Sequence, residues 1–280
     1  MINSFSRLRP FAARIAQRFV EENFDQISAS LAFTTLLSLV PLVALMLGLV
    51  AIAPFFSGFI EHLDHSVVRN LLPSSNAGMI IRHVLQFSHK ASKVTLLGAV
   101  VLAATVVLLL LTIERAFNHV WSVVAVRPWW RRFRLYAVLL ALWPLVVGGV
   151  VAATSYAVTS SLGFVDEPPW IRRFLFNAMG LVVLALFIGG LYYAVPFTRV
   201  AKRDAAWAGL VAAFGFLFMQ KAFQLYLENF PSYTMVYGTF ATVPIFLLWL
   251  YLSWAIVLLG ALVAATLPEF RGAAGRANAV

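Results

Sequence analysis

Amide and charged side chains interrupt one long apolar stretch of this 280-residue sequence, residues 205–227. Gln220, Lys221 and Gln224 lie there and are followed by Glu228. In a helix, Lys221 and Glu228 stand two turns apart on one face. Such groups could line a polar pathway or bind an anionic head group. The alternative is that the flexible lysine stem carries its ammonium group to the helix end, where an acid pairs with it.

Three further groups of polar residues have the same two interpretations. Ser30, Thr34 and Ser38 are four residues apart, and that spacing predicts either a wall of the pathway or close packing through small side chains. Another apolar stretch ends with Glu114, Arg115 and Asn118. They form either an inner gate of the pathway or a structural site in which Glu114 pairs with a nearby arginine. Tyr237 follows an aromatic turn and lines the pathway or belongs to an interfacial aromatic belt.

Signatures of catalysis and metal binding are scarce. Cysteine is absent, which excludes thiolate nucleophiles and Cys-ligated metals. His62 and His65 stand beside Glu61 and Asp64, but no third ligand group accompanies them. Walker, Rossmann, G-x-S-x-G and H-E-x-x-H motifs are also missing from the sequence. We therefore expect no catalytic residue, no metal and no cofactor.

The composition predicts the elements that position these residues. Hydrophobic residues make up 62% of the chain and charged ones 11%, whereas soluble domains are about 45–50% apolar and about 25% charged. A spanning helix needs roughly 20 apolar residues. We therefore expect an all-α polytopic membrane protein, a single domain over residues 1–280. Its six predicted transmembrane spans are residues 31–55, 94–113, 135–160, 174–196, 205–227 and 240–267.

The distribution of charge predicts the orientation of the chain. Fourteen of the 21 Lys and Arg lie on the side that holds both termini, and six lie opposite. By the positive-inside rule this places both termini in the cytoplasm. Residues 1–29, with an amphipathic helix at Phe11–Ile27, and the tail 268–280 are then cytoplasmic, whereas residues 56–93 form a periplasmic loop with two amphipathic helices. The net charge of +10 suits anionic lipid. Nucleic acid is not an expected partner, because no basic stretch is interleaved with exposed aromatics.

Four segments resemble the YihY/BrkB family of bacterial inner-membrane proteins, in matching order and spacing. They are Leu31–Leu42 (LAFTTLLSLVPL), Glu114–Trp121 (ERAFNHVW), Val195–Arg203 (VPFTRVAKR) and Asn229–Gly260 (NFPSYTMVYGTFATVPIFLLWLYLSWAIVLLG). Relatives often have Glu where this chain has Leu262. The resemblance implies six helices with cytoplasmic termini in the inner membrane. The family's older label, ribonuclease BN, finds no support, since no metal cluster or group of carboxylates suits a nuclease.

The sequence thus favours a transporter, or a transport-associated protein, for an amphiphile, lipid or small solute, with a path between the first, fifth and sixth spans. Membrane lipids are the expected partners. The alternative is a membrane assembly partner of an envelope complex, acting through the periplasmic loop and the turn 229–237, with a homo-oligomer also possible. An intramembrane enzyme acting on lipid head groups is a weaker alternative, because no paired acid and base appear.

Overall fold

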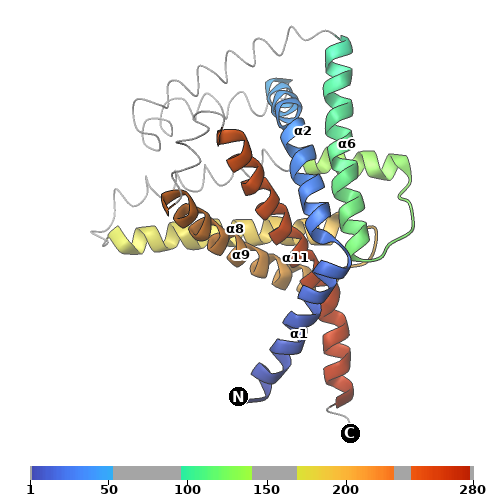
Figure 1. Ribbon diagram of the computed structural model, residues 1–280. Coiled ribbons are helices and arrows are strands. Elements are labelled where there is room, and N and C mark those ends of the chain that lie inside the picture. The colour runs from blue at the N-terminus through green and yellow to red at the C-terminus, as the bar shows by residue number, and fades with distance from the viewer. Residues whose placement is uncertain (1, 53–95, 141–168, 230–240, 278–280) are drawn as a thin grey trace, which may run out of the picture. The chain divides into compact units, whose positions relative to one another are not determined.

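The computed structural model describes residues 2–52, 96–140, 169–229 and 241–277, and the regular structure in these ranges is helical. The helices are α1 (Ile2–Glu21), α2 (Phe24–Ile52), α6 (Leu96–Val120), α8 (Pro169–Ala194), α9 (Lys202–Asn229) and α11 (Thr242–Ala277), as Figure 1 shows. A further helix covers residues 129–140. The predicted loop 56–93, most of the predicted third span and Tyr237 lie outside the described residues.

Four helices are long and apolar enough to cross a membrane in the parts of the chain that the structure describes: Phe24–Ala44, Val100–Val120, Lys202–Asn229 and Thr242–Phe270. They correspond to the first, second, fifth and sixth predicted spans. The apolar helix Ala178–Ala194 is shorter and lies in the fourth. Large apolar side chains such as Phe33, Leu108 and Phe218 are exposed on these helices, as is typical of a surface that faces lipid.

The N-terminal helices meet at a sharp turn. α1 ends at Glu21. α2 begins at Phe24 and continues without interruption into the first apolar stretch. Asn23 between them has a φ of 54°, a left-handed conformation that Asn tolerates better than most residues. The boundary therefore lies near residue 23, whereas the sequence placed one amphipathic helix across it, at Phe11–Ile27. Ile15 is buried on α1 and Arg14 is exposed, as the amphipathic pattern predicts.

The chain forms two compact units. The first comprises Met1–Leu36, Leu111–Leu135 and Asn177–Val280, and the second comprises Leu37–Leu110 and Tyr136–Phe176. Every contact described below lies within the first unit. Its fully buried side chains include Phe24, Phe117, Tyr192, Leu258 and Leu262.

Small residues bring α8 and α9 together as an antiparallel pair, joined by residues 195–201, which we call the link (Figure 1). A Cβ atom added to Gly209 would lie 2.8 Å from the backbone nitrogen of Gly189, and one on Gly189 would lie 3.0 Å from the carbonyl oxygen of Ala205. The two backbones are thus in direct contact, which is the usual way in which helices associate in lipid.

α11 packs against α9 and is tied to α8. The hydroxyl of Tyr192 donates a hydrogen bond of 2.7 Å to the carbonyl oxygen of Val257. A Cβ atom at Gly260 would lie 2.9 Å from Cβ of Ala212 and 3.0 Å from Cζ of Tyr192. The absence of a side chain at Gly260 therefore makes room for the tyrosine ring at the junction of the three helices.

Candidate functional site

The site begins with a buried carboxylate near the end of α6. The Glu114 side chain is 2% exposed, and its Oε2 lies 3.0 Å from Nε of Arg132. Its Oε1 lies 3.8 Å from Nε of Arg127. Two guanidinium groups thus share one carboxylate, and the group of three carries a net charge of +1.

Arg127 and Asn118 hold the link in place. Nη2 of Arg127 donates to the carbonyl oxygens of Val195, at 3.1 Å, and Pro196, at 3.3 Å. Its guanidinium carbon lies 5.1 Å from the ring centre of Phe197, within cation–π range. The backbone N–H of Phe197 donates to Oδ1 of Asn118 at 2.8 Å. The link is therefore fixed by side chains from the segment around α6, and Arg127 remains only 8% exposed.

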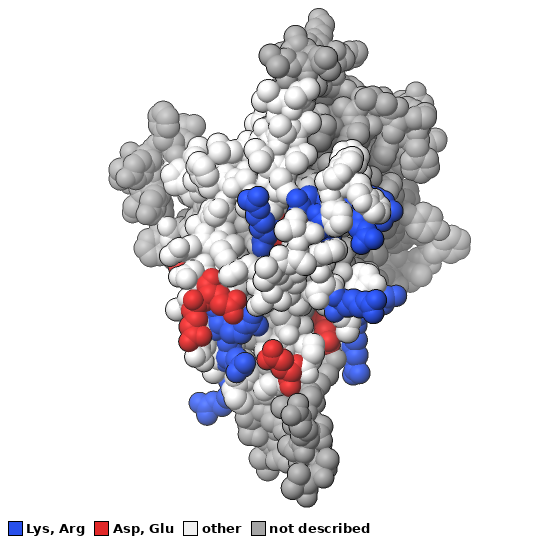
Figure 2. All heavy atoms as spheres, turned by 90° about the vertical axis from the view of Figure 1, so that its right-hand side faces the viewer, with Lys and Arg blue, Asp and Glu red and all other residues white. Residues whose placement is uncertain are grey.

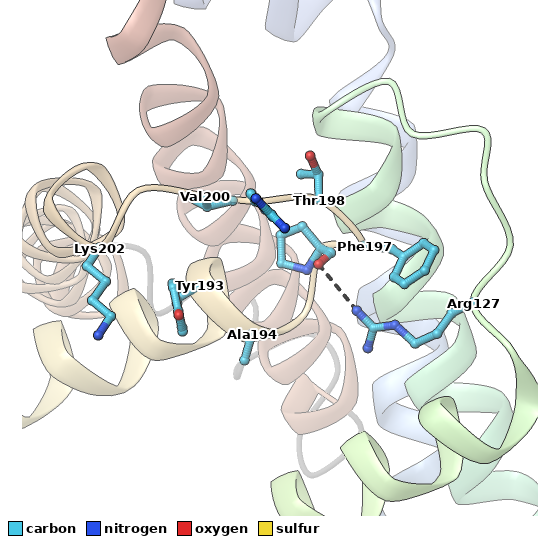
Figure 3. Close-up of a pocket in the computed structure, with 9 residues that line it drawn as sticks. Arg127, Tyr193, Ala194, Phe197, Thr198, Val200 and Lys202 are labelled. Carbon is cyan, nitrogen blue, oxygen red and sulfur yellow. Dashed lines mark hydrogen bonds between the residues drawn. The ribbon is translucent and has the colours of Figure 1, made fainter.

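A cavity of about 660 Å³ opens over the link, and we call it the cationic hollow. Figure 3 shows Arg127 on one side of it and Lys202 and Tyr193 on the other. The Lys202 ammonium nitrogen lies 6.0 Å from the Tyr193 ring centre. The lining residues include three cations and no acid: Arg127, Tyr193, Ala194, Pro196, Phe197, Thr198, Arg199, Val200 and Lys202.

A second cavity of about 330 Å³ runs between α8 and α9, and we call it the apolar groove. Apart from Tyr193 and Lys202, its walls are aliphatic side chains and glycines: Val182, Ala185, Leu186, Gly189, Gly190, Ala205, Ala206 and Leu210. Tyr193 and Lys202 also line the cationic hollow. The two cavities therefore share this pair of residues in their walls. Gly190 is the open point of the wall, because a Cβ atom there would meet nothing within 4 Å.

The charge around the hollow is predominantly positive. Asp204, in the first turn of α9, is buried and does not line the cavity. Arg199, Lys202 and Arg203 are all exposed. On the face shown in Figure 2, basic side chains gather in one zone together with some acidic ones, and much of the remaining described surface is uncharged. An anionic group is the ligand that such a surface attracts.

The predicted gate residues separate into two groups in the structure. Asn118 bonds to the link directly, and Glu114, four residues earlier, pairs with Arg127, which also bonds to the link. Arg115 lies between them in sequence and is exposed.

The predicted pathway residues on α9 form an exposed ladder along the helix. Nζ of Lys221 donates to Oε1 of Gln224 at 3.5 Å, and Nε2 of Gln224 donates to Oε1 of Glu228 at 2.8 Å. Gln220 is exposed beside them.

The predicted hydroxyl face of α2 is not uniform. Ser30 is exposed, Thr34 is half-buried and Ser38 is buried. The Thr34 hydroxyl donates to the backbone oxygen of Ser30 at 2.8 Å, a local bond that is common for hydroxyls in membrane helices. The bond between α2 and α11 comes instead from the neighbouring Thr35, whose Oγ1 accepts from Nε1 of Trp254 at 3.0 Å.

The residues that line the cationic hollow were not singled out from the sequence. Arg127, Arg199 and Lys202 contributed to the count of cytoplasmic charge, and the link lies within the segment VPFTRVAKR that carries part of the family resemblance. The signal available was that two basic connections, 115–134 and 199–203, fall on the same predicted side. Among the residues that the structure describes, no group of three or more His, Cys, Asp or Glu could hold a metal ion, and His62 and His65 lie outside them.

Comparison with known proteins identifies the family. The family described as "Virulence factor BrkB" matches residues 15–279. The chain is similar to UPF0761 membrane proteins of Azoarcus sp. (strain BH72), with 43% identity over 94% of this chain and 64% of the relative. It is also similar to those of Aromatoleum aromaticum (41% identity, 94% and 64%) and Nitrosospira multiformis (40% identity, 94% and 62%).

The chain thus spans just under two thirds of the length of these relatives. No solved structure matches it. Because the family match extends over nearly all of the sequence, the chain belongs to the virulence factor BrkB family of membrane proteins.

Proposed function

We propose that the chain is an inner-membrane protein that binds an anionic amphiphile and takes part in its transport. The observation that carries this proposal is that the apolar groove and the cationic hollow share Tyr193 and Lys202 in their walls. An amphiphile has two corresponding parts. Its hydrocarbon chain suits the apolar groove, and its polar head suits the cationic hollow.

The two cavities contribute differently to binding. A hydrocarbon chain that leaves lipid for an apolar groove gains little free energy, because both surroundings are equally apolar. The groove therefore positions the chain, and the charged hollow distinguishes one head group from another. Basic pockets between helices at the cytoplasmic face of a membrane bind lipid head groups in this way.

Both termini are cytoplasmic in this proposal. Arg127 and Lys202 belong to connections that the charge count assigns to one side, and the structure joins these connections through the link. Lys221 stands nineteen residues after Lys202 on α9, about 28 Å away at 1.5 Å per residue. Hydrocarbon is about 30 Å thick. The hollow and the ladder of Lys221, Gln224 and Glu228 therefore fit opposite surfaces of the membrane.

Filling the groove tests the transport proposal. We expect Gly190→Leu to place a side chain in the groove without disturbing the fold, because a Cβ atom at Gly190 has open space. Gly180→Leu is the matched control, since Gly180 lies on the same helix, is equally open and does not line either cavity.

The assay uses proteoliposomes that contain a fluorescently labelled anionic phospholipid, with dithionite quenching to report movement between leaflets. Gly190→Leu should abolish the protein-dependent movement, and Gly180→Leu should retain it. Equal movement by the two variants would show that the groove is not the route.

The ladder on α9 is the second part of the proposed route. Replacing Lys221 and Gln224 by Leu removes two of the three polar groups of the ladder, so movement of the labelled lipid should stop while the amount of protein in the membrane stays the same. Unchanged movement would exclude the ladder from the route. The role of the groove would still be tested separately by Gly190→Leu.

A further inference from the structure

We infer that the cationic hollow is a binding site for a phosphate-type anion, and that this anion is the head group of the amphiphile. This inference rests on the proposed function and names the chemical class of its ligand. The hollow brings together two arginines and a lysine, Arg127, Arg199 and Lys202, without a lining carboxylate.

The state of Arg127 makes its side of the hollow positive before any ligand binds. Oε2 of Glu114 lies 3.0 Å from Nε of Arg132, and its Oε1 lies 3.8 Å from Nε of Arg127. The carboxylate neutralises one charge of the two guanidinium groups, and one positive charge is left over. Since Arg127 is 92% buried and is bonded to the two carbonyl oxygens of the link, its position is fixed in advance.

Arg199 and Lys202 provide the adaptable side of the site. Both are exposed, so they can close around an anion without leaving other partners buried. A guanidinium group matches two phosphate oxygens at once, and an ammonium group acts as a mobile point charge. The exposed Thr198 also lines the hollow, and its hydroxyl is a further donor for a phosphate oxygen. The oxygens of a phosphate group are arranged tetrahedrally, so donors on different sides of the hollow can reach it at once, whereas the two oxygens of a carboxylate lie in one plane.

The wall shared with the apolar groove distinguishes a head group from a free ion. Lys202 lines both cavities, so an anion bound to its ammonium group lies beside a residue that also lines the groove. A phosphate that carries a hydrocarbon chain fills both cavities, whereas inorganic phosphate fills only the hollow.

The experiment compares three probes on the full chain in an uncharged detergent. Native mass spectrometry measures binding of lysophosphatidylglycerol, which is anionic, and of lysophosphatidylcholine, which has the same type of chain and a zwitterionic head. Calorimetry measures binding of inorganic phosphate. The variants are Arg199→Gln, Lys202→Gln and Gly190→Leu, and Arg203→Gln is the control, because Arg203 is exposed and does not line the hollow. Thermal unfolding confirms that each variant is folded.

We expect lysophosphatidylglycerol to bind at least tenfold more tightly than lysophosphatidylcholine. Loss of one charge-assisted hydrogen bond should reduce that affinity about tenfold or more in Arg199→Gln and in Lys202→Gln. Arg203→Gln should bind like the unaltered protein. Inorganic phosphate should bind weakly, should compete with the anionic lipid, and should be unaffected by Gly190→Leu.

The outcomes separate the two proposals. Equal binding of the two lysolipids, with both lost in Gly190→Leu, would show that the net charge of the head group is not recognised. It would overturn the anion site and leave the amphiphile proposal standing. Tight binding of inorganic phosphate, with lysolipid binding unaffected by Gly190→Leu, supports the anion site and overturns the amphiphile as its source. An equal loss of affinity in Arg203→Gln would show that general surface charge, and not the hollow, attracts the anion.

Discussion

Neutralising Glu114 should destabilise the first unit more than any change to a surface ion pair. Glu114→Gln keeps the size of the side chain and removes the charge that two guanidinium groups share. Breaking a buried ion pair by removing one partner costs about 3–5 kcal/mol. Arg127 is 8% exposed, but Arg132 is 27% exposed and regains some hydration. We therefore expect a loss near the lower end of that range, about 3 kcal/mol.

The pair between Arg14 and Glu269 provides the matched control. Its charged atoms are 3.6 Å apart, and its side chains are 63% and 62% exposed. Exposed pairs contribute about 0–1 kcal/mol, so Glu269→Gln should be nearly silent. The measurement is the free energy of unfolding by SDS titration in mixed micelles, made on both variants under identical conditions.

A third variant identifies the cause of the loss. If the cost of Glu114→Gln comes from the uncompensated charge of Arg127, then adding Arg127→Met should cost less than the sum of the two single substitutions. Additive costs would indicate that shape, and not charge, is what matters at this position. A Glu114→Gln variant as stable as Glu269→Gln would refute the reasoning altogether.

Three further predictions concern the packing that supports the site, and each is measured by the same SDS titration. Gly260→Ala should lose about 1–3 kcal/mol by overpacking, and Tyr192→Phe in the same chain should restore part of it; an unchanged stability would contradict the close contact. Trp254→Phe should lose about 0.5–1 kcal/mol with the bond to Thr35, and a loss above about 2 kcal/mol would point to a larger role of the indole. Asn118→Leu should lose about 1 kcal/mol by leaving a backbone donor without its acceptor, whereas Asn118→Asp keeps an acceptor oxygen and should retain stability; equal losses would contradict this assignment.

The helices of this fold are largely readable from the sequence, because hydrocarbon imposes long apolar runs on any chain that crosses it. Four predicted spans coincide with helices long enough to cross a membrane. The join between α1 and α2 could not be placed in the same way. It depends on one residue, Asn23, in a left-handed conformation, and neither hydropathy nor spacing reports such a local event.

The candidate site was only partly accessible from the sequence. The four-residue spacing of Glu114 and Asn118 placed both on one face, but their partners come from 127, 132 and 197, which no periodicity connects to them. The cost of charge in hydrocarbon directed attention to Lys221. That criterion does not detect Arg199 and Lys202. A charge at a membrane surface costs little free energy, so a ligand-binding cation there looks the same in the sequence as any other surface cation.

The contact of Gly189 with α9 has a consequence for ligand shape. Main-chain atoms, and not rotatable side chains, fix the separation of the two helices at this point. The apolar groove beside them therefore cannot adjust its width at this point by rotation of side chains. If the groove holds an alkyl tail, as we propose, it should therefore accept a straight tail more readily than a methyl-branched one with the same number of carbon atoms, because the branched tail is wider.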